Sequence, residues 1–237
     1  MNFAWEGLGD GVHRCRLPFL DVTVGLVVGR TGTLLIDTGT TLAEATAIKA
    51  DVTQITGSSV SHIVLTHNHF DHILGSSVFA GAAIYAAPEI SATVAAQAEH
   101  LRADAIRHGA DPDEVARAIA ALRMPEHQIS RAALDLGGKT VAIIHPGRGH
   151  TGHDLIAVVA EPAVVFCGDL VEESGDPVAD DDSDPAAWPT TLGRVLAAGG
   201  PDARYVPGHG AVVVLQGREA IPDPRMHDLM AKRVGLR

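Results

Sequence analysis

The chain has 237 residues, of which 46% are hydrophobic, 20% charged and 4% aromatic. This is the profile of a soluble globular protein with an aliphatic core. Its 29 acidic and 18 basic residues give a formal net charge of −11. Because a nucleic-acid-binding protein needs a basic face to neutralise phosphates, we expect no nucleic acid partner.

Membrane association and export are also disfavoured by the sequence. No apolar run reaches the 18 or so residues that a membrane-spanning helix needs. Residues 1–13 contain neither Lys nor Arg and no signal-like apolar run. The two cysteines, Cys15 and Cys167, cannot form a disulfide framework. We therefore expect a cytoplasmic protein without a membrane partner.

The first third of the chain favours short strands and one helix. Residues 22–37 contain two β-branched runs that flank a Gly29–Gly32 turn, which predicts two paired strands. Residues 40–55 show apolar spacing near 3.6 and predict a helix. Short apolar runs at 62–66 and 82–86 predict two more strands.

Residues 88–123 change in character, because Ala, Glu, Arg and Gln replace the β-branched residues. One helix is expected over about 88–108. A second is expected to begin at Asp111, with Pro112 at its first position and Glu114 completing a capping box. This helical insertion, near 88–135, is either a lid over a site or a helix pair packed on the edge of the fold.

The remainder again favours strands, predicted at 140–144, 155–159, 163–166 and 205–207. An acidic, Pro-rich loop is expected over 172–189, a helix over 190–198 and a closing helix in the last 28 residues. Because strands and helices mix along the whole length, the sequence predicts one α/β domain over residues 1–237.

The most informative segment is His67-Asn68-His69-Phe70-Asp71-His72, which reads H-x-H-x-D-H. Imidazole nitrogen suits Zn, Fe or Mn, and carboxylates suit the harder ions. The spacing does not place these side chains on one helix face, but it fits a tight loop after a strand. Within that loop, His67 and His69 can point one way and Asp71 and His72 another, which allows two adjacent metals.

Three further segments carry a metal-binding residue type next to glycine at a predicted strand end. They are His150 within Gly149-His150-Thr151, Asp169 within Cys167-Gly168-Asp169, and His209 within Pro207-Gly208-His209-Gly210. Strand ends are where sheets commonly carry chemistry, and glycine permits the tight backbone that such a site needs.

In this order, the motifs resemble those of the metallo-β-lactamase superfamily of metal-dependent hydrolases. The resemblance also includes Asp37 in Ile36-Asp37-Thr38-Gly39, and it spans about residues 20–210. It implies an α/β fold of the αββα sandwich type with a dinuclear site at one edge. The Asp at position 169 is similar to the glyoxalase II and lactonase-like branches, and not to β-lactamases that place Cys there.

The resemblance also implies a role for each residue. His67, His69 and His150 would hold the first metal, and Asp71, His72 and His209 the second. Asp169 would bridge both metals, and Asp37 would orient a ligand-bearing loop without binding metal. Asp71 and Asp169 are the candidate catalytic residues.

The donor set is chemically consistent with two divalent ions, zinc being expected and iron or manganese being alternatives. Five neutral imidazoles and two carboxylates carry a charge of −2. Two divalent ions bring a charge of +4, so the site remains positive and can also bind a hydroxide. Metal binding lowers the pKa of water to about 7. We therefore expect a metal-bridging hydroxide to attack the carbonyl of a small-molecule ester, thioester, lactone or amide.

Several alternatives to this hydrolase remain. A β-lactamase proper is disfavoured by Asp169, and a glutathione-dependent glyoxalase II by the short chain after His209. An iron-dependent oxygenase of the same fold would use fewer ligands. A nuclease is disfavoured by charge, and a non-catalytic binding module would be expected to have lost a ligand.

Other polar and aromatic residues have ordinary interpretations. His153 is expected at the surface or behind the ligands, and residues 180–184 as a solvated acidic loop. Cys167 is expected in the core. Phe19, Phe70 and Trp188 are candidates for an apolar pocket or, equally, for core packing.

Overall fold

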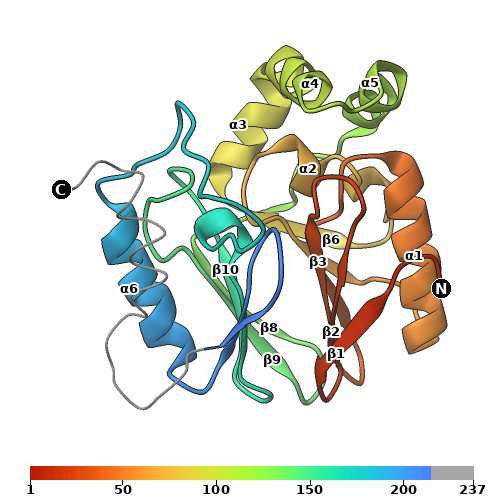
Figure 1. Ribbon diagram of the computed structural model, residues 1–237. Helices are drawn as coiled ribbons and strands as arrows, with labels where there is room; N and C mark the ends of the chain where they lie inside the picture. Colours follow the sequence, from red (N-terminus) through yellow and green to blue (C-terminus); the bar gives the residue numbers. More distant parts are fainter. Residues whose placement is uncertain (215–237) are drawn as a thin grey trace.

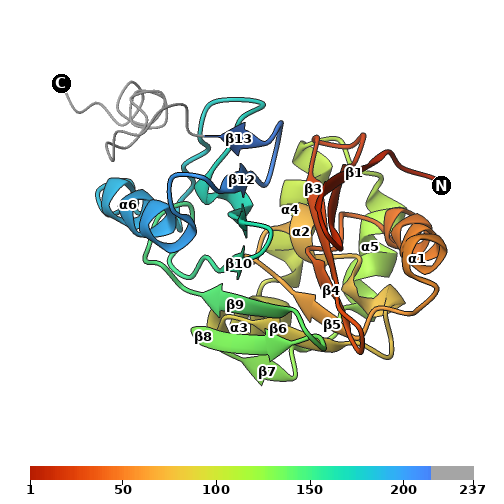
Figure 2. The ribbon, with the colours of Figure 1, turned by 90° about the horizontal axis from the view of Figure 1, so that it is seen from below.

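The computed structural model describes residues 1–214. The closing helix and its approach loop were predicted over 210–237, of which residues 215–237 lie outside the described part. Two β-sheets pack face to face, and helices cover the outer face of each, which gives four layers (Figure 2). Helix α6 lies outside one sheet, and α1, α4 and α5 lie outside the other (Figures 1 and 2). This is the predicted αββα sandwich.

The first sheet is formed by the first part of the chain and has the order β1-β2-β3-β4-β5-β6-β7. Strands β1 to β4 are antiparallel neighbours, whereas β4 to β7 are parallel neighbours. The strands are β1 (Trp5–Gly9), β2 (Val12–Arg16), β3 (Thr23–Val28), β4 (Thr33–Ile36), β5 (His62–Val64), β6 (Ala83–Ala86) and β7 (His127–Gln128).

The second sheet comes from the later part of the chain and has the order β13-β12-β11-β10-β9-β8. Only the β11–β12 pair is parallel, and the other neighbours are antiparallel. The strands are β8 (Arg131–Asp135), β9 (Thr140–Ile144), β10 (Ile156–Val159), β11 (Val164–Phe166), β12 (Arg204–Val206) and β13 (Val213–Val214).

Alternation along the strands sends side chains into different interfaces of the sandwich. In β3, Val24 and Leu26 pack toward the outer helices, while Val27 packs toward the other sheet. In β11, Phe166 packs between the sheets, while Val165 packs toward α6. Three separate apolar cores, one for each interface between layers, follow from this period of two.

The helices bury one face each. Helix α1 begins with a capping box between Thr41 and Glu44 and ends at Gly57, whose φ of 68° suits glycine. The helices are α1 (Leu42–Thr56), α2 (Phe70–Ile73), α3 (Pro88–Ala96), α4 (Ala98–Arg107), α5 (Pro112–Ala121) and α6 (Trp188–Gly199), with short 3₁₀ turns at Ser76–Val78 and Gly168–Leu170. No helix within residues 1–214 is both long and apolar enough to span a bilayer.

The helical insertion is confirmed for residues 88–121, but two details of it were wrong. The single helix expected over 88–108 is interrupted at Gln97, whose φ of −121° ends α3 and begins α4. The break lets Ile90 and Leu101 pack into the same core. Asp111 does accept hydrogen bonds from the amides of Asp113 and Glu114, yet the Glu114 carboxylate pairs with Arg117 instead of closing a capping box.

The insertion also ends earlier than expected. Residues 131–135 form β8, which pairs along its length with β9 around a Gly137–Gly138 turn. Its sequence, Arg-Ala-Ala-Leu-Asp, favours helix locally, but tertiary pairing overrides this preference. Strands β1 and β2 were also missed, because His13, Arg14 and Arg16 interrupt the apolar pattern.

Candidate metal centre

Strand direction brings the candidate ligands to one edge of the sandwich. Strands β4 and β5 run parallel in the first sheet. In the second sheet β11 and β12 are parallel, and β9 runs the same way because β10 is antiparallel to both β9 and β11. His67, Asp169 and His209 each lie three residues beyond the last residue of β5, β11 or β12. His150 lies in the loop that follows β9.

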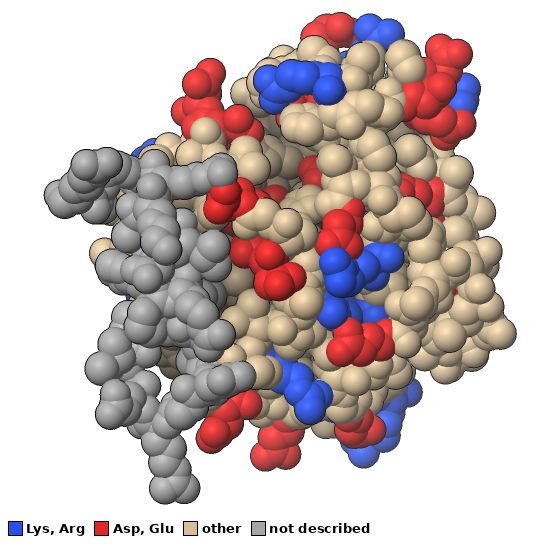
Figure 3. All heavy atoms as spheres, viewed as in Figure 1, with Lys and Arg blue, Asp and Glu red and all other residues tan. Residues whose placement is uncertain are grey.

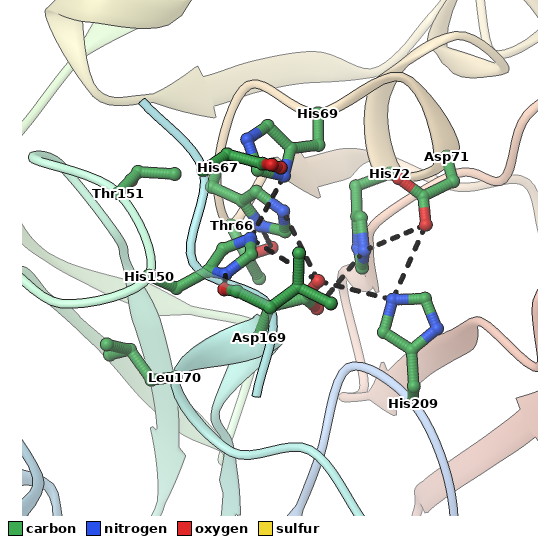
Figure 4. A network of polar contacts seen from close by, with 12 residues as sticks. Thr66, His67, His69, Asp71, His72, His150, Thr151, Asp169, Leu170 and His209 are labelled. Carbon is green, nitrogen blue, oxygen red and sulfur yellow. Dashed lines mark hydrogen bonds and ion pairs between the residues drawn. The ribbon is translucent and has the colours of Figure 1, made fainter. Parts of the chain in front are cut away.

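The first cluster consists of His67, His69, His150 and Asp169. Nε2 of His150 lies 2.9 Å from Nδ1 of His69. Oδ2 of Asp169 lies 3.5 Å from Nε2 of His150 and 3.7 Å from Nε2 of His67. The three rings and the carboxylate thus converge on one point (Figure 4).

The second cluster consists of Asp71, His72 and His209. Oδ2 of Asp71 lies 3.6 Å from Nε2 of His72 and 3.4 Å from Nε2 of His209. Asp169 lies between the clusters, with Oδ1 3.2 Å from Nε2 of His72 and Oδ2 3.2 Å from Nε2 of His209 (Figure 4). The Asp169 carboxylate is therefore the link between the two groups.

The outward-facing nitrogen of each imidazole has a polar partner. This contact selects the tautomer whose other nitrogen faces the centre as a lone pair, as metal-ligating histidines require. The partners are Thr66 Oγ1 for His67 (3.0 Å), Asp182 Oδ2 for His69 (3.4 Å), Asp37 Oδ2 for His72 (2.8 Å), the Val178 carbonyl for His150 (3.1 Å) and the Leu20 carbonyl for His209 (2.7 Å).

Asp37 contacts the loop that carries His67 and the ring of His72, and it contacts no atom that faces the centre. Its Oδ1 accepts from the amide of Thr66 at 2.8 Å, and its Oδ2 accepts from Thr66 Oγ1 at 2.8 Å. Asp37 adopts a φ of 61°, which is strained for a residue with a Cβ. The strained backbone directly after β4 places a buried carboxylate beneath both His67 and His72.

The backbone around Asp169 is equally constrained. A Cβ built on Gly208 would lie 1.8 Å from Oδ1 of Asp169, so only glycine permits this approach. Burial by itself would raise the pKa of Asp169, but the positive potential of His72 and His209 holds that pKa well below its usual value. Asp169 is therefore ionised at neutral pH, as a carboxylate that binds a metal ion must be.

Burial and the nearby carboxylates shift the pKa values of the histidines in different directions. Burial lowers the pKa of His150 to about 4, so its ring is neutral and able to donate a lone pair. Burial opposes protonation of His209 too, but Asp169 raises its pKa to about 9. Without a cation between them, His209 and Asp169 form an ion pair. A bound divalent cation would take over the role of the proton.

The residues present fit a metal-ion site, by an observation independent of their types. Within the described part of the chain, Nε2 of His67, Nε2 of His72 and Oδ1 of Asp169 are buried without a hydrogen bond of normal geometry. Burying such atoms unpaired is costly, and all three face the centre. Cations at this point would satisfy them.

Asp182 is a site residue that sequence reasoning missed. The acidic run 180–184 was interpreted as a solvated loop, but Asp182 reaches back to His69. His69 and Asp182 are 113 positions apart, so no local pattern connects them. The backbone carbonyls of Leu20 and Val178 carried no sequence signal either, since any residue supplies a carbonyl.

The loop that carries His150 is supported from two sides. The buried Asp154 carboxylate accepts from the amide and the hydroxyl of Thr151, both at 2.9 Å, and burial raises its pKa to about 7. The ring of Trp188 lies 5.8 Å from that of His150. Trp188 and Phe70 are buried core residues, and Phe19 packs against the core, so core packing accounts for all three.

The family model of the metallo-beta-lactamase superfamily matches residues 17–209. The chain belongs to this superfamily. The match includes Asp37 and all seven candidate ligands, and it confirms the resemblance drawn from the motifs.

Solved structures of the superfamily share the whole fold. The mono-zinc form of the metallo-beta-lactamase FIM-1 from Pseudomonas aeruginosa is 18% identical, with a TM-score of 0.69 over 99% of this chain and 95% of that one. A metallo-beta-lactamase from Pontibacter korlensis is 17% identical, with a TM-score of 0.70 over 99% and 98%. One from Erythrobacter litoralis, with beta mercaptoethanol in the active site, is 22% identical, with a TM-score of 0.68 over 98% and 97%. At these identities the likeness establishes the fold alone.

Proposed function

We propose that this protein is a dinuclear metal-dependent hydrolase of a small-molecule ester, thioester, lactone or amide. The nucleophile attacks the carbonyl carbon, and the bond from that carbon to oxygen, sulfur or nitrogen is cleaved. The observation that carries the proposal is the position of Asp169, whose two oxygens each lie within 3.2 Å of a histidine of the second cluster while Oδ2 also faces the first cluster. One carboxylate between two such clusters is an arrangement suited to two cations a few ångströms apart.

The donor set favours zinc in both positions, since it combines imidazole nitrogen with few carboxylates. Two divalent ions would lower the pKa of a bound water molecule and so supply a nucleophile at neutral pH. His67, His69, His150 and Asp169 would hold the first ion. Asp71, His72, His209 and Asp169 would hold the second.

The chain's own carboxylates handle charge and protons. Asp169 is ionised and joins the two clusters, which fixes their separation. Oδ2 of Asp71 lies between His72 and His209 and is only 8% exposed as a side chain. We assign Asp71 as the carboxylate that orients the attacking water and accepts its proton, and Asp169 as the carboxylate that holds the two clusters in place for this step.

A metallo-β-lactamase is the second candidate, because the structural relatives described above carry that name. Asp169 argues against a β-lactamase, because the β-lactamases compared in the sequence analysis place Cys at this position. An iron oxygenase is less compatible with seven converging ligands. Both cysteines are free and buried, as expected for the reducing cytoplasm that we propose as the location.

The test combines metal analysis with a substrate panel. Protein purified without added metal should contain two zinc ions per chain by plasma mass spectrometry. It should then hydrolyse a member of a panel of thioesters, lactones and aryl esters faster than a cephalosporin or a phosphodiester, and lose that activity on chelation. One iron per chain, or preference for the cephalosporin, would favour an alternative.

A further inference from the structure

A pocket of about 810 Å³ opens beside the metal centre. His69 is the candidate ligand that lines it, so a molecule in the pocket would extend away from the first cluster. One wall comes from α3 and α4, and the other from residues 180–182. The insertion therefore forms part of the wall of the site.

The rim of this pocket is acidic. Five carboxylates line it, while Arg107 is the one Lys or Arg among the described lining residues, and Arg107 already pairs with Asp104. Figure 3 shows acidic side chains around the hollow between α4 and the second half of the molecule. The lining carboxylates are Glu89, Asp104, Asp180, Asp181 and Asp182.

Two buried polar side chains in the lining point independently to a ligand. Asn68 and His153 are each only 8% exposed, and Oδ1 of Asn68 and Nε2 of His153 have no hydrogen-bond partner within the described residues. The amide of Asn68 is oriented by its Nδ2, which donates to Thr93 Oγ1 at 2.9 Å. The remaining free atom of Asn68 is therefore an acceptor.

These features select one kind of ligand. Carboxylates and a fixed amide oxygen accept hydrogen bonds, so they favour a group that donates several and carries positive charge. Burial lowers the pKa of His153, so its ring adds no competing cation. An anionic group would face three carboxylates that have no cationic partner among the described residues, Glu89, Asp180 and Asp181, and is disfavoured by like charge.

We propose that this pocket is a substrate subsite that binds a protonated amine on the substrate, with Asn68 Oδ1 and the rim carboxylates as acceptors. The inference rests on the proposed hydrolase function and narrows its substrate to cationic molecules. Asp182 is assigned to His69, so Glu89, Asp180 and Asp181 carry the recognition that can be tested without disturbing the centre.

The probes are three thiophenyl esters that differ in one substituent. They derive from 4-(aminomethyl)benzoic acid, 4-ethylbenzoic acid and 4-(carboxymethyl)benzoic acid, which are cationic, neutral and anionic respectively. The first two have nearly the same shape. We expect kcat/KM for the cationic ester to exceed that for the neutral one by roughly tenfold, the size of one charge-assisted contact, and the anionic ester to be slowest.

The matched variants separate local recognition from net charge. Glu89→Gln, Asp180→Asn and Asp181→Asn combined should bring the cationic-to-neutral ratio of kcat/KM close to one. The control combines Glu99→Gln, Glu161→Gln and Asp202→Asn, which removes the same charge from exposed positions outside the pocket. It should preserve the ratio.

A binding measurement distinguishes failure of this inference from failure of the proposed function. Calorimetry uses the corresponding ketones, in which a methylene replaces the thioester sulfur. Tighter binding of the cationic ketone, lost in the pocket variant, supports the subsite even if no ester is cleaved. Hydrolysis of the esters without a charge preference overturns the subsite and leaves the hydrolase intact. Equal binding of the ketones, or preference for the anion, also overturns it.

Discussion

Oδ2 of Asp37 lies 2.8 Å from Nδ1 of His72, and neither atom faces the centre of the site. The same oxygen also accepts from Thr66 Oγ1, which contacts His67. One buried carboxylate therefore orients a candidate ligand of each cluster, although Asp37 itself is not a member of either cluster.

Asp37→Asn should weaken metal binding by about 10- to 100-fold, the range seen when outer partners of metal ligands are lost. The asparagine has one oxygen for three donors, so its amino group would face either Thr66 N–H or the His72 ring. Chelator competition measures the affinity. Unchanged affinity would show that Asp37 only supports the fold.

Asp169→Ala should abolish turnover and lower the metal content below two ions per chain, because the side chain that joins both clusters is removed. Plasma mass spectrometry and the substrate panel measure the two effects. Asp202→Ala, at an exposed turn, is the control for loss of a carboxylate. A wild-type rate in the Asp169 variant would contradict the bridging role.

Gly208→Ala should impair metal binding, because the new Cβ would lie 1.8 Å from Oδ1 of Asp169 and displace that carboxylate. Gly193→Ala is the matched control, since a Cβ there has no neighbour within 4 Å. The control should bind metal normally and gain about 0.5–1 kcal/mol of stability, because alanine favours the interior of α6. Equal metal affinity in both variants would contradict the expected clash.

Asp182→Asn should reduce metal affinity by about tenfold, less than at Asp37, because Asp182 is more exposed and contacts His69 at 3.4 Å. Its exposed neighbour supplies the comparison: Asp181→Asn removes the same charge from the same loop without touching a ligand. If both variants lose affinity equally, the effect is long-range electrostatics and not a contact.

Asp51 fastens the N-terminal segment to α1 by accepting hydrogen bonds from the amides of Asn2 and Phe3 and the indole of Trp5. Burial would raise its pKa, but these donors outweigh burial and lower it. The stabilisation is thus fully present above the unfolded pKa of about 3.9 and is lost as the pH falls through the lower folded value.

Asp51→Asn should therefore cost about 2 kcal/mol of unfolding free energy at pH 7, since charge-assisted hydrogen bonds are lost. The difference from the wild type should shrink below pH 4. Urea denaturation at both pH values measures it. A pH-independent difference would show that shape and not charge holds this contact.

The sequence was most informative where chemistry repeats at strand ends. His67, His69, Asp71 and His72 were predicted from the H-x-H-x-D-H motif, His150, Asp169 and His209 from glycine-rich strand ends, and Asp37 from the family resemblance. The structure brings all eight side chains together. Long-range partners were out of reach. Asp182, the Leu20 carbonyl and the broken helix at Gln97 depend on contacts between distant segments or on packing, which no local window records.

The two sheets contribute unequal but complementary parts of the site. His67 to His72 follow β5 of the first sheet, while His150, Asp169 and His209 follow strands of the second. Cations held here would cross-link the two halves of the chain, and neither half alone would possess a complete coordination sphere. Ion binding should thus raise the free energy of unfolding by mass action. Removal of the ions should weaken the packing between the two sheets before either sheet itself unfolds.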